Sequence, residues 1–262
     1  MKLVIIGAGN VATVLGRLFI KNGHSVLQVV SRSSNTAQEL ATELVCDFTD
    51  NSASVNMMAD IYLVAIADKE LAGLGGQLQL GNKLVVHTAG SVSKDVLKNI
   101  SNNYGVIYPL QSLRKHHFNL QQDIPLLIDA NNDFSREILL KLAKTISNNT
   151  RLAGDEMRMK LHVAAVFVSN FTNHLYELAA LYCDKEGADF KLLLPLIEET
   201  AIRLQHYKPY EMRTGPAARK DMDTIGAHLK LLDTYPELTD IYLKMTSSII
   251  NLNKEIKTEL IK

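Results

Sequence analysis

The chain opens with a short, unbroken apolar run that is followed by glycines and then by a helical pattern. Leu3 to Ile6 contains β-branched residues, as expected for a strand buried on both faces of a parallel sheet. Over residues 10–22 apolar side chains recur at helical spacing, and Asn22-Gly23 supplies a left-handed stop. Val26 to Val30 is a second apolar run. These segments predict a strand, a helix and a second strand.

Apolar runs of strand type continue through the first half of the chain. They lie at residues 61–66, 84–87, 105–108 and 125–128, with helical or polar segments between them. This alternation predicts a doubly wound parallel sheet. After Gly154 the periodicity is helical up to Lys262. We therefore expect an α/β protein with an N-terminal Rossmann domain at residues 1–152, followed by an all-α domain at residues 153–262.

Composition and charge narrow the choice of partners. Lys plus Arg equals Asp plus Glu at 28 each, so no net positive field favours nucleic acid or anionic lipid. The apolar fraction of 47% is typical of an ordinary soluble protein, and a small-molecule substrate is the expected partner. Cys46 and Cys183 have no paired spacing, so we expect no disulfide and no zinc site. The apolar N-terminal run is too short for a secretory signal, which points to the cytoplasm.

A glycine-rich turn joins the first strand to the first helix, with the sequence Gly7-Ala8-Gly9-Asn10-Val11-Ala12. In a dinucleotide-binding turn the first glycine permits the tight bend, and the second lets the backbone approach the pyrophosphate. The helix N-terminus then holds the anion. The alternative is that these glycines only close a strand-to-helix turn. The position between a buried strand and an amphipathic helix favours a nucleotide site.

The end of the second predicted strand indicates which dinucleotide is bound. NAD enzymes usually have an acidic residue there for the ribose 2′-hydroxyl, whereas this chain has Ser31-Arg32-Ser33-Ser34. Arg32 can stack on adenine and pair with a 2′-phosphate, and Ser31 and Ser33 can donate hydrogen bonds to it. These residues predict NADP as the cofactor. The alternative is a solvated turn.

With these features the whole chain loosely resembles the pyrroline-5-carboxylate reductase-like NADP oxidoreductases. It is more similar to a branch in which a Rossmann-like domain precedes an α-helical domain of unknown function. The segments that carry this likeness are His87-Thr88-Ala89-Gly90-Ser91, Tyr108-Pro109-Leu110-Gln111-Ser112, residues 160–170 and residues 214–221. The resemblance implies an oxidoreductase, and it leaves the substrate open.

Ligands of open α/β sheets bind beyond the carboxyl ends of the strands. We therefore expect the nicotinamide to lie near the residues at three strand ends, Ala65-Ile66-Ala67-Asp68, His87-Thr88-Ala89-Gly90-Ser91 and Tyr108-Pro109. Small side chains there would let a flat ring lie close, although tight sheet packing also explains them. His87 and Ser91 could protonate a substrate. The alternative is a His87 satisfied by backbone, with Ser91 or Ser93 capping the next helix.

The helix predicted from Asp155 carries a polar stripe on an otherwise apolar segment. Its members are His162, Ser169, Asn173 and Glu177, with Asn170 at its edge. Buried polar groups must be paired, so the stripe faces water, pairs across a dimer or lines a cleft. The related β-hydroxyacid dehydrogenases use a Lys followed four residues later by an Asn. Here Ala164 follows Lys160, so we rank Lys160 below His162 and Asn170.

Our leading hypothesis is hydride transfer between NADPH and a carbonyl or imine carbon. His162 or His87 would move the proton and Asn170 would orient the substrate. Arg219 is a further candidate, for a substrate carboxylate, although a surface pair with Asp223 at helical spacing is the commoner outcome. His116-His117 is a weak candidate for a metal pair, because adjacent loop residues rarely chelate one ion, and we expect no metal.

The sequence leaves two alternatives to a reductase that acts on a metabolite, and it also predicts an oligomeric state. The chain could be a noncatalytic dinucleotide sensor or interaction protein, because fold does not establish function. A deazaflavin could replace the metabolite as acceptor. The long apolar-striped helices, at about residues 155–185 and 191–205, exceed what one small bundle needs, which predicts a homodimer formed through the C-terminal helices.

Overall fold

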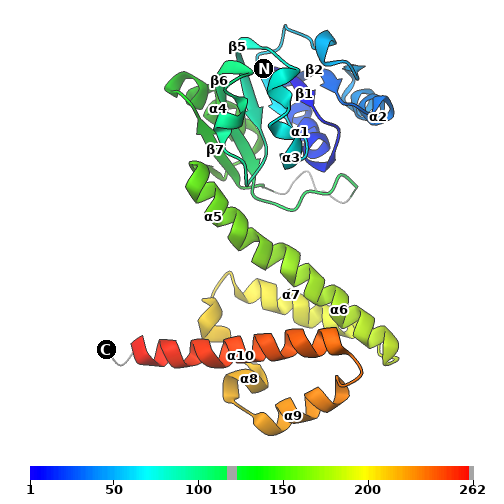
Figure 1. Cartoon of the computed structure of the whole chain (residues 1–262), viewed down its shortest axis with the longest axis vertical. Helices are drawn as coiled ribbons and strands as arrows, with labels where there is room; N and C mark the ends of the chain where they lie inside the picture. Colours follow the sequence, from blue (N-terminus) through cyan, green and yellow to red (C-terminus); the bar gives the residue numbers. More distant parts are fainter. Residues whose placement is uncertain (117–122, 260–262) are drawn as a thin grey trace. The chain divides into compact units, whose positions relative to one another are not determined.

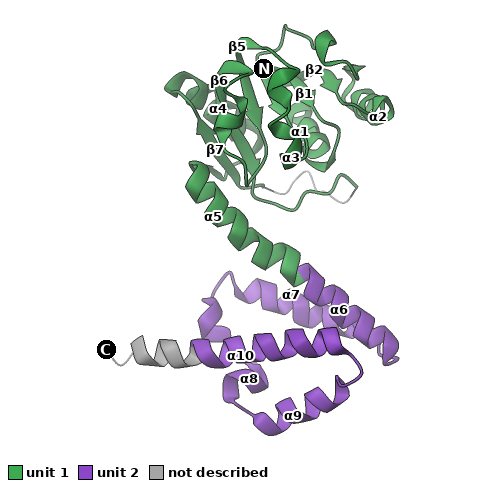
Figure 2. Cartoon of the chain, viewed as in Figure 1, with its two compact units in different colours: residues 1–172 green, residues 173–262 purple. Residues whose placement is uncertain are grey.

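A computed structural model describes residues 1–116 and 123–259 of the chain, and His117 of the predicted histidine pair lies outside these ranges. The chain divides into two compact units, Met1–Thr172 and Asn173–Lys262 (Figure 2). The last strand of the first unit ends at Leu152, where the sequence predicts a domain boundary, and the division between the units comes later, within a helical stretch. The extent of a substrate domain over residues 153–262 stays a prediction.

The first unit is built on one eight-stranded sheet with the strand order β3-β2-β1-β4-β5-β6-β7-β8. The strands are β1 (Lys2–Ile6), β2 (Ser25–Val30), β3 (Asp47–Thr49), β4 (Ile61–Val64), β5 (Gly81–His87), β6 (Ser101–Pro109), β7 (Leu126–Ala130) and β8 (Thr150–Leu152). All neighbours pair in parallel except β6 and β7. The predicted doubly wound sheet is confirmed, with one antiparallel pair added. The sequence analysis missed β3 and β8, which are each only three residues long.

Helices cover both faces of this sheet (Figure 1). The α-helices of the first unit that precede β8 are α1 (Asn10–Lys21), α2 (Ser34–Leu44), α3 (Asp68–Leu71) and α4 (Asp133–Ile146). Alternate strand residues enter separate cores: Leu3 and Ile5 pack with α1, α2 and α4, whereas Val4 and Ile6 pack with Leu71 of α3. Burial on both faces explains why these strands are continuous apolar runs in the sequence.

The parallel strands end in register along one edge of the sheet. Ile6 pairs with Val30 on one side and with Val64 on the other, and His87 pairs with Val64 and with Val106. The turns that follow β1, β2, β4 and β5 are therefore neighbours in space. This edge is where open α/β sheets bind ligands.

The helical run predicted from Asp155 is interrupted by a wider turn. It consists of α5 (Asp155–Ala165), the π-helical segment η4 (Val166–Phe171) and α6 (Thr172–Lys185). Ser169 and Asn170 lie within the π-helical segment, where hydrogen bonds reach one residue farther than in an α-helix. The predicted polar stripe assumed regular α-helical spacing, so this spacing does not hold past Ala165.

The second unit is helical, as the sequence predicts. After α6 it contains the 3₁₀ turn η5 (Phe190–Leu193), α7 (Leu194–Arg203), the turn η6 (Pro209–Met212), α8 (Gly215–Arg219), α9 (Met222–Leu231) and α10 (Pro236–Glu259). The residues after Thr214 form two helices rather than one, because Lys220 adopts a left-handed conformation (φ 58°) and the Asp221 side chain caps α9. Across the helices that the structure describes, none has both the length and the apolar character that a membrane crossing requires.

Candidate functional site

The turn after β1 can be made only with glycine at its first position. Gly7 has a φ of +114°, and a Cβ there would lie 2.2 Å from the carbonyl oxygen of Ala65 on the neighbouring strand end. Its N–H donates to the carbonyl of Val30 at 2.7 Å, which ties the turn to the end of β2. The chain therefore bends tightly between two strand ends before it enters α1.

Gly9 faces open space at the start of α1. A Cβ on Gly9 would meet no protein atom within 4 Å, and its φ of −86° is one that any residue adopts. The first N–H groups of a helix have no acceptor within the helix. Among the described residues no side chain caps them, and the first turn carries no acidic residue. An anion such as a pyrophosphate fits here, because backbone can approach it and the helix dipole favours negative charge.

A pocket of about 360 Å³ lies over this turn and the neighbouring strand ends. Predicted cofactor residues that line it are Gly7, Ala8, Gly9, Ser31, Arg32, Ala65, Ile66 and Ala67. The predicted residues that do not line it are Asn10, Val11, Ser33, His87, Ala89 and Gly90. The pocket thus joins the glycine turn, the end of β2 and the end of β4 into one site.

Two carboxylates line the same pocket and were missed in the sequence analysis. Asp50 directly follows the short strand β3, and Glu70 lies on α3. The Glu70 carboxylate accepts a hydrogen bond of 2.6 Å from the Arg32 guanidinium, whose side chain is 82% exposed. The end of β2 is free of carboxylates, as predicted, but the pocket itself is not. Little in the sequence indicated Asp50, because the strand before it, β3, has only three residues, which are too few to show strand periodicity.

A second group of side chains lies at the ends of β5 and β6. The Tyr108 hydroxyl, at the end of β6, is 3.0 Å from Nδ1 of His162 on α5, and the two rings meet edge to face. A Cβ on Gly90 would lie 2.7 Å from that Nδ1 and 2.8 Å from Cζ of Tyr108. Glycine at position 90 is therefore what allows the pair to form. His162 was predicted as a catalytic residue, whereas its partner Tyr108 was predicted only to line the nicotinamide side and was given no chemical role.

Charged groups surround the Tyr108 hydroxyl. The Ser91 hydroxyl donates to the Asp68 carboxylate at the start of α3. Burial raises the pKa of Tyr108, the negative charge of Asp68 raises it further, and the positive charge of Arg158 opposes both. The phenol is therefore protonated at neutral pH and is a hydrogen-bond donor.

Arg158 is the most buried charged side chain of this region, with 1% exposure. Its Nη2 donates to the carbonyl of Val92 and, at 2.8 Å, to the Asp155 carboxylate. Its Nε and Nη1 have no hydrogen-bond partner within the described part of the chain. Burial raises the pKa of Asp155, but hydrogen bonds from Ser93, Arg158 and the Lys94 N–H outweigh it and hold that pKa below its usual value. Sequence reasoning did not select this arginine, because nothing in the spacing indicates its burial.

His87 is completely buried beneath this group. Its Nδ1 accepts a hydrogen bond of 3.1 Å from the N–H of Ala89, so backbone satisfies one ring nitrogen. Burial, and then the nearby charge of Arg158, lower the pKa of His87 to about 4, so the ring is neutral at pH 7. The Ser93 hydroxyl accepts a hydrogen bond from the N–H of Asp95 and caps the turn that follows. Of the two serines considered as caps from the sequence, Ser91 and Ser93, it is therefore Ser93 that caps this turn.

The remaining predicted site residues lie on exposed surfaces. Lys160 pairs with Glu156 at 2.5 Å, one helical turn away. Asn170 is exposed in η4 and has no side-chain partner among the described residues. Arg219, in the second unit, has Asp221 rather than the predicted Asp223 as its nearest carboxylate, at 3.9 Å. The structure does not bring these three residues into the pocket or into the Tyr108–His162 pair.

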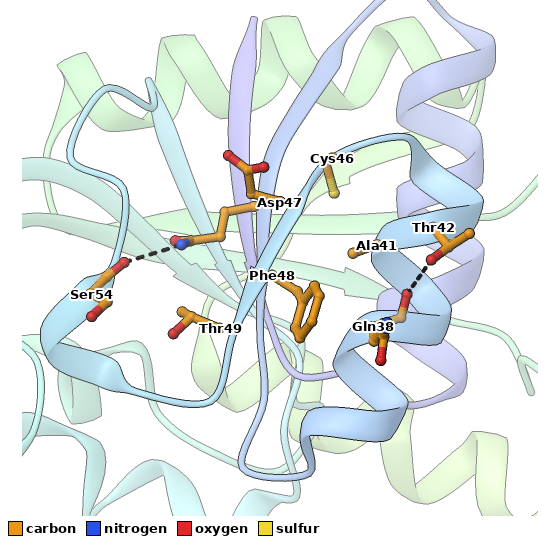
Figure 3. A pocket seen from close by; sticks show the side chains of 9 residues that line it. Gln38, Ala41, Thr42, Cys46, Asp47, Phe48, Thr49 and Ser54 are labelled. Carbon is orange, nitrogen blue, oxygen red and sulfur yellow. Dashed lines mark hydrogen bonds between the residues drawn. The ribbon is translucent and has the colours of Figure 1, made fainter.

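A wider hollow of about 520 Å³ lies along β3, between Gln28 of β2 and the helix α2 (Figure 3). None of the predicted site residues lines it. Gln28 donates from its amide to the carbonyl of Ser54 there. Burial raises the pKa of the Cys46 thiol to about 11, so this cysteine is not a nucleophile at neutral pH. This hollow therefore lacks the features of a reactive site.

No three His, Cys, Asp or Glu side chains come together closely enough to bind a metal ion in residues 1–116 and 123–259. The expectation of no metal stays a prediction. The chemistry available at the strand ends is thus anion binding at the glycine turn after β1 and proton donation by Tyr108 at the end of β6.

Two protein families match consecutive parts of the chain. Residues 2–90 match the family described as NADP oxidoreductase coenzyme F420-dependent, and residues 124–249 match a domain of unknown function, DUF2520. No curated protein matches the chain.

Solved structures match the chain over nearly its whole length. A "putative NADP oxidoreductase" from Bacteroides fragilis is 38% identical, with 95% of this chain and 98% of that chain covered and a TM-score of 0.89. A 1-pyrroline-5-carboxylate reductase from Streptococcus pyogenes (15% identity, coverage 97% and 98%, TM-score 0.65) shares the fold. So does an imine reductase from Myxococcus stipitatus in complex with NADP+ (16% identity, coverage 99% and 95%, TM-score 0.61). The chain belongs to the NADP oxidoreductase family of the Bacteroides fragilis protein, with the F420-dependent oxidoreductase domain in its N-terminal part and DUF2520 in its C-terminal part.

Proposed function

We propose that this protein is an NADP-dependent reductase that acts on a carbonyl or imine group of a small metabolite. The observation that carries the proposal is the pocket at the glycine turn, where Gly9 leaves space open above an uncapped helix N-terminus. The family and its structural relatives support a nicotinamide dinucleotide there. When bound, this cofactor supplies a hydride.

The chain's own residues fall into two groups in this proposal. Gly7, Ala8 and Gly9, with the N–H groups at Asn10 and Val11, hold the pyrophosphate. Ser31, Arg32 and Ser33 hold the adenosine phosphate, and Ala65, Ile66 and Ala67 floor the pocket. Ala89 and Gly90 lead from β5 toward His162, which is the proposed proton-transfer residue. His87 supports this loop from below as a neutral, buried ring, and Asn170, Lys160 and Arg219 remain candidates for substrate contact.

A thermal shift panel with NADPH, NADP+, NADH and NAD+ tests cofactor binding. A ligand at about a hundred times its dissociation constant adds roughly 2.7 kcal/mol of stability. For a chain of this size that corresponds to a rise in the melting temperature of roughly 5–10 °C. Consumption of NADPH with a panel of keto acids, aldehydes and cyclic imines then tests reduction. A flat thermal panel contradicts the proposal.

The preference for NADPH over NADH rests on Arg32 and gives a second prediction. Arg32→Ala removes the charge expected to meet the 2′-phosphate, and hydrogen bonds to charged groups contribute about 1.5–3 kcal/mol. We expect the dissociation constant of NADPH to rise roughly 10- to 100-fold while that of NADH changes by less than about threefold. Fluorescence titration of both nucleotides measures this.

Asp50→Asn is the matched control, because Asp50 lines the same pocket and could hold a ribose hydroxyl instead. This variant should leave NADPH binding unchanged or tighter. If Asp50→Asn weakens NADH binding, Arg32→Ala leaves NADPH binding unchanged and the wild-type protein binds NADH more tightly than NADPH, the proposed preference is overturned.

We also propose that the protein is a homodimer formed through its C-terminal helices. Among residues 173–252, only Leu178, Ala217 and Ile225 are buried hydrophobic residues. Large apolar side chains of the same unit are more than half exposed, among them Leu181, Leu192, Leu196 and Leu204. Monomeric proteins rarely leave so much apolar surface in water. A second copy offers the same apolar surface, as a two-fold symmetric interface requires.

Sedimentation tests this assembly. The wild-type protein should sediment at twice the 29.1 kDa of the chain at micromolar concentration. Leu196→Lys, which places a charge on the exposed apolar face of α7, should shift it toward the monomer. Glu198→Lys adds the same side chain to the same helix at a polar position and should leave the dimer intact. A monomeric wild-type protein rules the homodimer out.

A further inference from the structure

The phenol of Tyr108 is the best-placed acid at the carboxyl edge of the sheet. It lies at the end of β6, the strand next to β5, whose following loop carries Gly90. The hydroxyl is hydrogen-bonded at 3.0 Å to a ring nitrogen that can itself carry a proton. The Tyr108 side chain is only partly buried, whereas His87 has no exposed surface. A substrate can therefore reach Tyr108 and cannot reach His87.

We propose that Tyr108 is the residue that gives the substrate its proton, and that His162 positions the phenol and replaces the proton. This inference rests on the proposed reductase function and deepens it. The substrate double bond gains a hydride at carbon, with two electrons from the reduced dinucleotide. Its oxygen or nitrogen takes the proton of the Tyr108 hydroxyl. The Tyr108 oxygen then takes the proton on Nδ1 of His162, and the other ring nitrogen of His162 takes one from water.

The packing around the pair supports a positioned donor. Only glycine at position 90 leaves room for the contact between Tyr108 and His162, because a Cβ there would come within 2.8 Å of both rings. Tyr108 and His162 come from different elements, β6 and α5, so the hydrogen bond fixes the phenol between the sheet and the helix. A general acid must be held within hydrogen-bond reach of the atom that it protonates.

The charges that face the phenol keep it protonated until it is used. Asp68, held by the Ser91 hydroxyl, opposes formation of a phenolate, and the buried Arg158 favours it. With burial added, the pKa of Tyr108 is above its ordinary value. The phenol is therefore in its acid form across the neutral range, which a proton donor requires.

Tyr108→Phe removes only the hydroxyl and is the central variant. We expect its turnover with NADPH to fall about 100-fold or more, as is typical when a general acid is removed, while NADPH binds within about twofold of wild type. Tyr104→Phe is the matched control, because Tyr104 is on the same strand and its hydroxyl bonds Asp95 at 3.2 Å. That variant should retain wild-type turnover.

Gly90→Ala disturbs the contact between Tyr108 and His162 while leaving both side chains chemically unchanged. The added methyl group should lower turnover by about the same factor as Tyr108→Phe does. The double variant Tyr108→Phe with His162→Ala should be no slower than Tyr108→Phe alone, because the two residues act as a unit. The ¹⁵N NMR signals of the His162 ring provide a measurement independent of activity. Tyr108→Phe should shift the Nδ1 signal, and Tyr104→Phe should not.

The outcomes separate the two proposals. If the wild-type protein binds no nucleotide and consumes no NADPH with any carbonyl or imine, the reductase function fails, and the role of Tyr108 fails with it. If the wild-type protein turns over and Tyr108→Phe matches its rate, only the role of Tyr108 is overturned. Slow turnover of Tyr108→Phe with an unshifted His162 signal overturns the proton replacement by His162.

Discussion

Gly7→Ala is expected to destabilise the first unit by about 3 kcal/mol or more, because left-handed backbone and steric overlap both penalise the added methyl group. The φ of Gly7 is +114°, and the Cβ would lie 2.2 Å from a backbone oxygen, that of Ala65, which cannot rotate away. Relief would require β1 and β4 to separate, and these strands pair along the centre of the sheet. Urea denaturation of the full chain measures the change in the free energy of unfolding.

Gly9→Ala is the matched control for this loss of stability. The same methyl group meets no protein atom within 4 Å there, and the φ of −86° suits alanine. Alanine is a poorer helix cap than glycine, but it also lowers the entropy of the unfolded chain, so the two effects oppose each other. We expect a net change below about 1 kcal/mol. Equal losses for the two variants would contradict the geometry of the turn.

Asp155→Ala is expected to lower the free energy of unfolding by about 3 kcal/mol. This value is the lower end of the range for a broken buried ion pair, and we choose it because Asp155 is itself 34% exposed. The variant leaves the Arg158 guanidinium, which is 1% exposed, without its counter-charge. The Ser93 hydroxyl and the Lys94 N–H lose their acceptor as well. Since the pKa of Asp155 lies below its ordinary value, its contribution is fully present at neutral pH and disappears only as the pH falls through that lowered pKa.

Arg158→Met should cost much less than Asp155→Ala. It removes two nitrogen atoms that have no partner in the described residues, together with the Nη2 hydrogen bonds to Val92 and Asp155. Removal of one partner of an ion pair is costly mainly where it leaves the other charge buried, whereas Asp155 is 34% exposed and keeps its bonds to Ser93 and Lys94. We therefore expect a loss below about 1.5 kcal/mol. The two free energies of unfolding, measured in the same buffer, decide the order. If Arg158→Met is the more damaging variant, the account of this cluster is wrong.

The longer strands of the sheet could be predicted from the sequence, because each contains a continuous apolar run. Runs such as Leu3 to Ile6 are apolar because both faces of the sheet are covered, and this is visible without a structure. The strand Asp47–Thr49 was missed, because it is short and partly polar, and Asp50 was missed with it. The π-helical turn at Val166–Phe171 was also missed, because an apolar stretch gives no sign of one extra residue in a turn.

The candidate site was predictable only in part, for a different reason. The glycine turn and Arg32 are recognisable because their roles follow from neighbours in the chain. The contact of Tyr108 with His162 joins residues 54 positions apart, and no local pattern determines such a pair. Sequence reasoning selected His162 from a helical stripe that the π-turn then interrupts, and it placed Tyr108 near the nicotinamide without a chemical role, so the pairing of the two residues was missed. The burial of Arg158 depends on tertiary packing in the same way.

NADPH titration of the wild-type protein and of Gly9→Ala tests the central proposal most directly. Gly9→Ala retains the fold, so only the space above the helix N-terminus changes. We predict that wild type binds one NADPH per chain and that Gly9→Ala binds it at least tenfold more weakly, because the methyl group occupies the space through which the backbone approaches the pyrophosphate. Equal affinities, or no binding by the wild-type protein, would contradict a dinucleotide site at this turn.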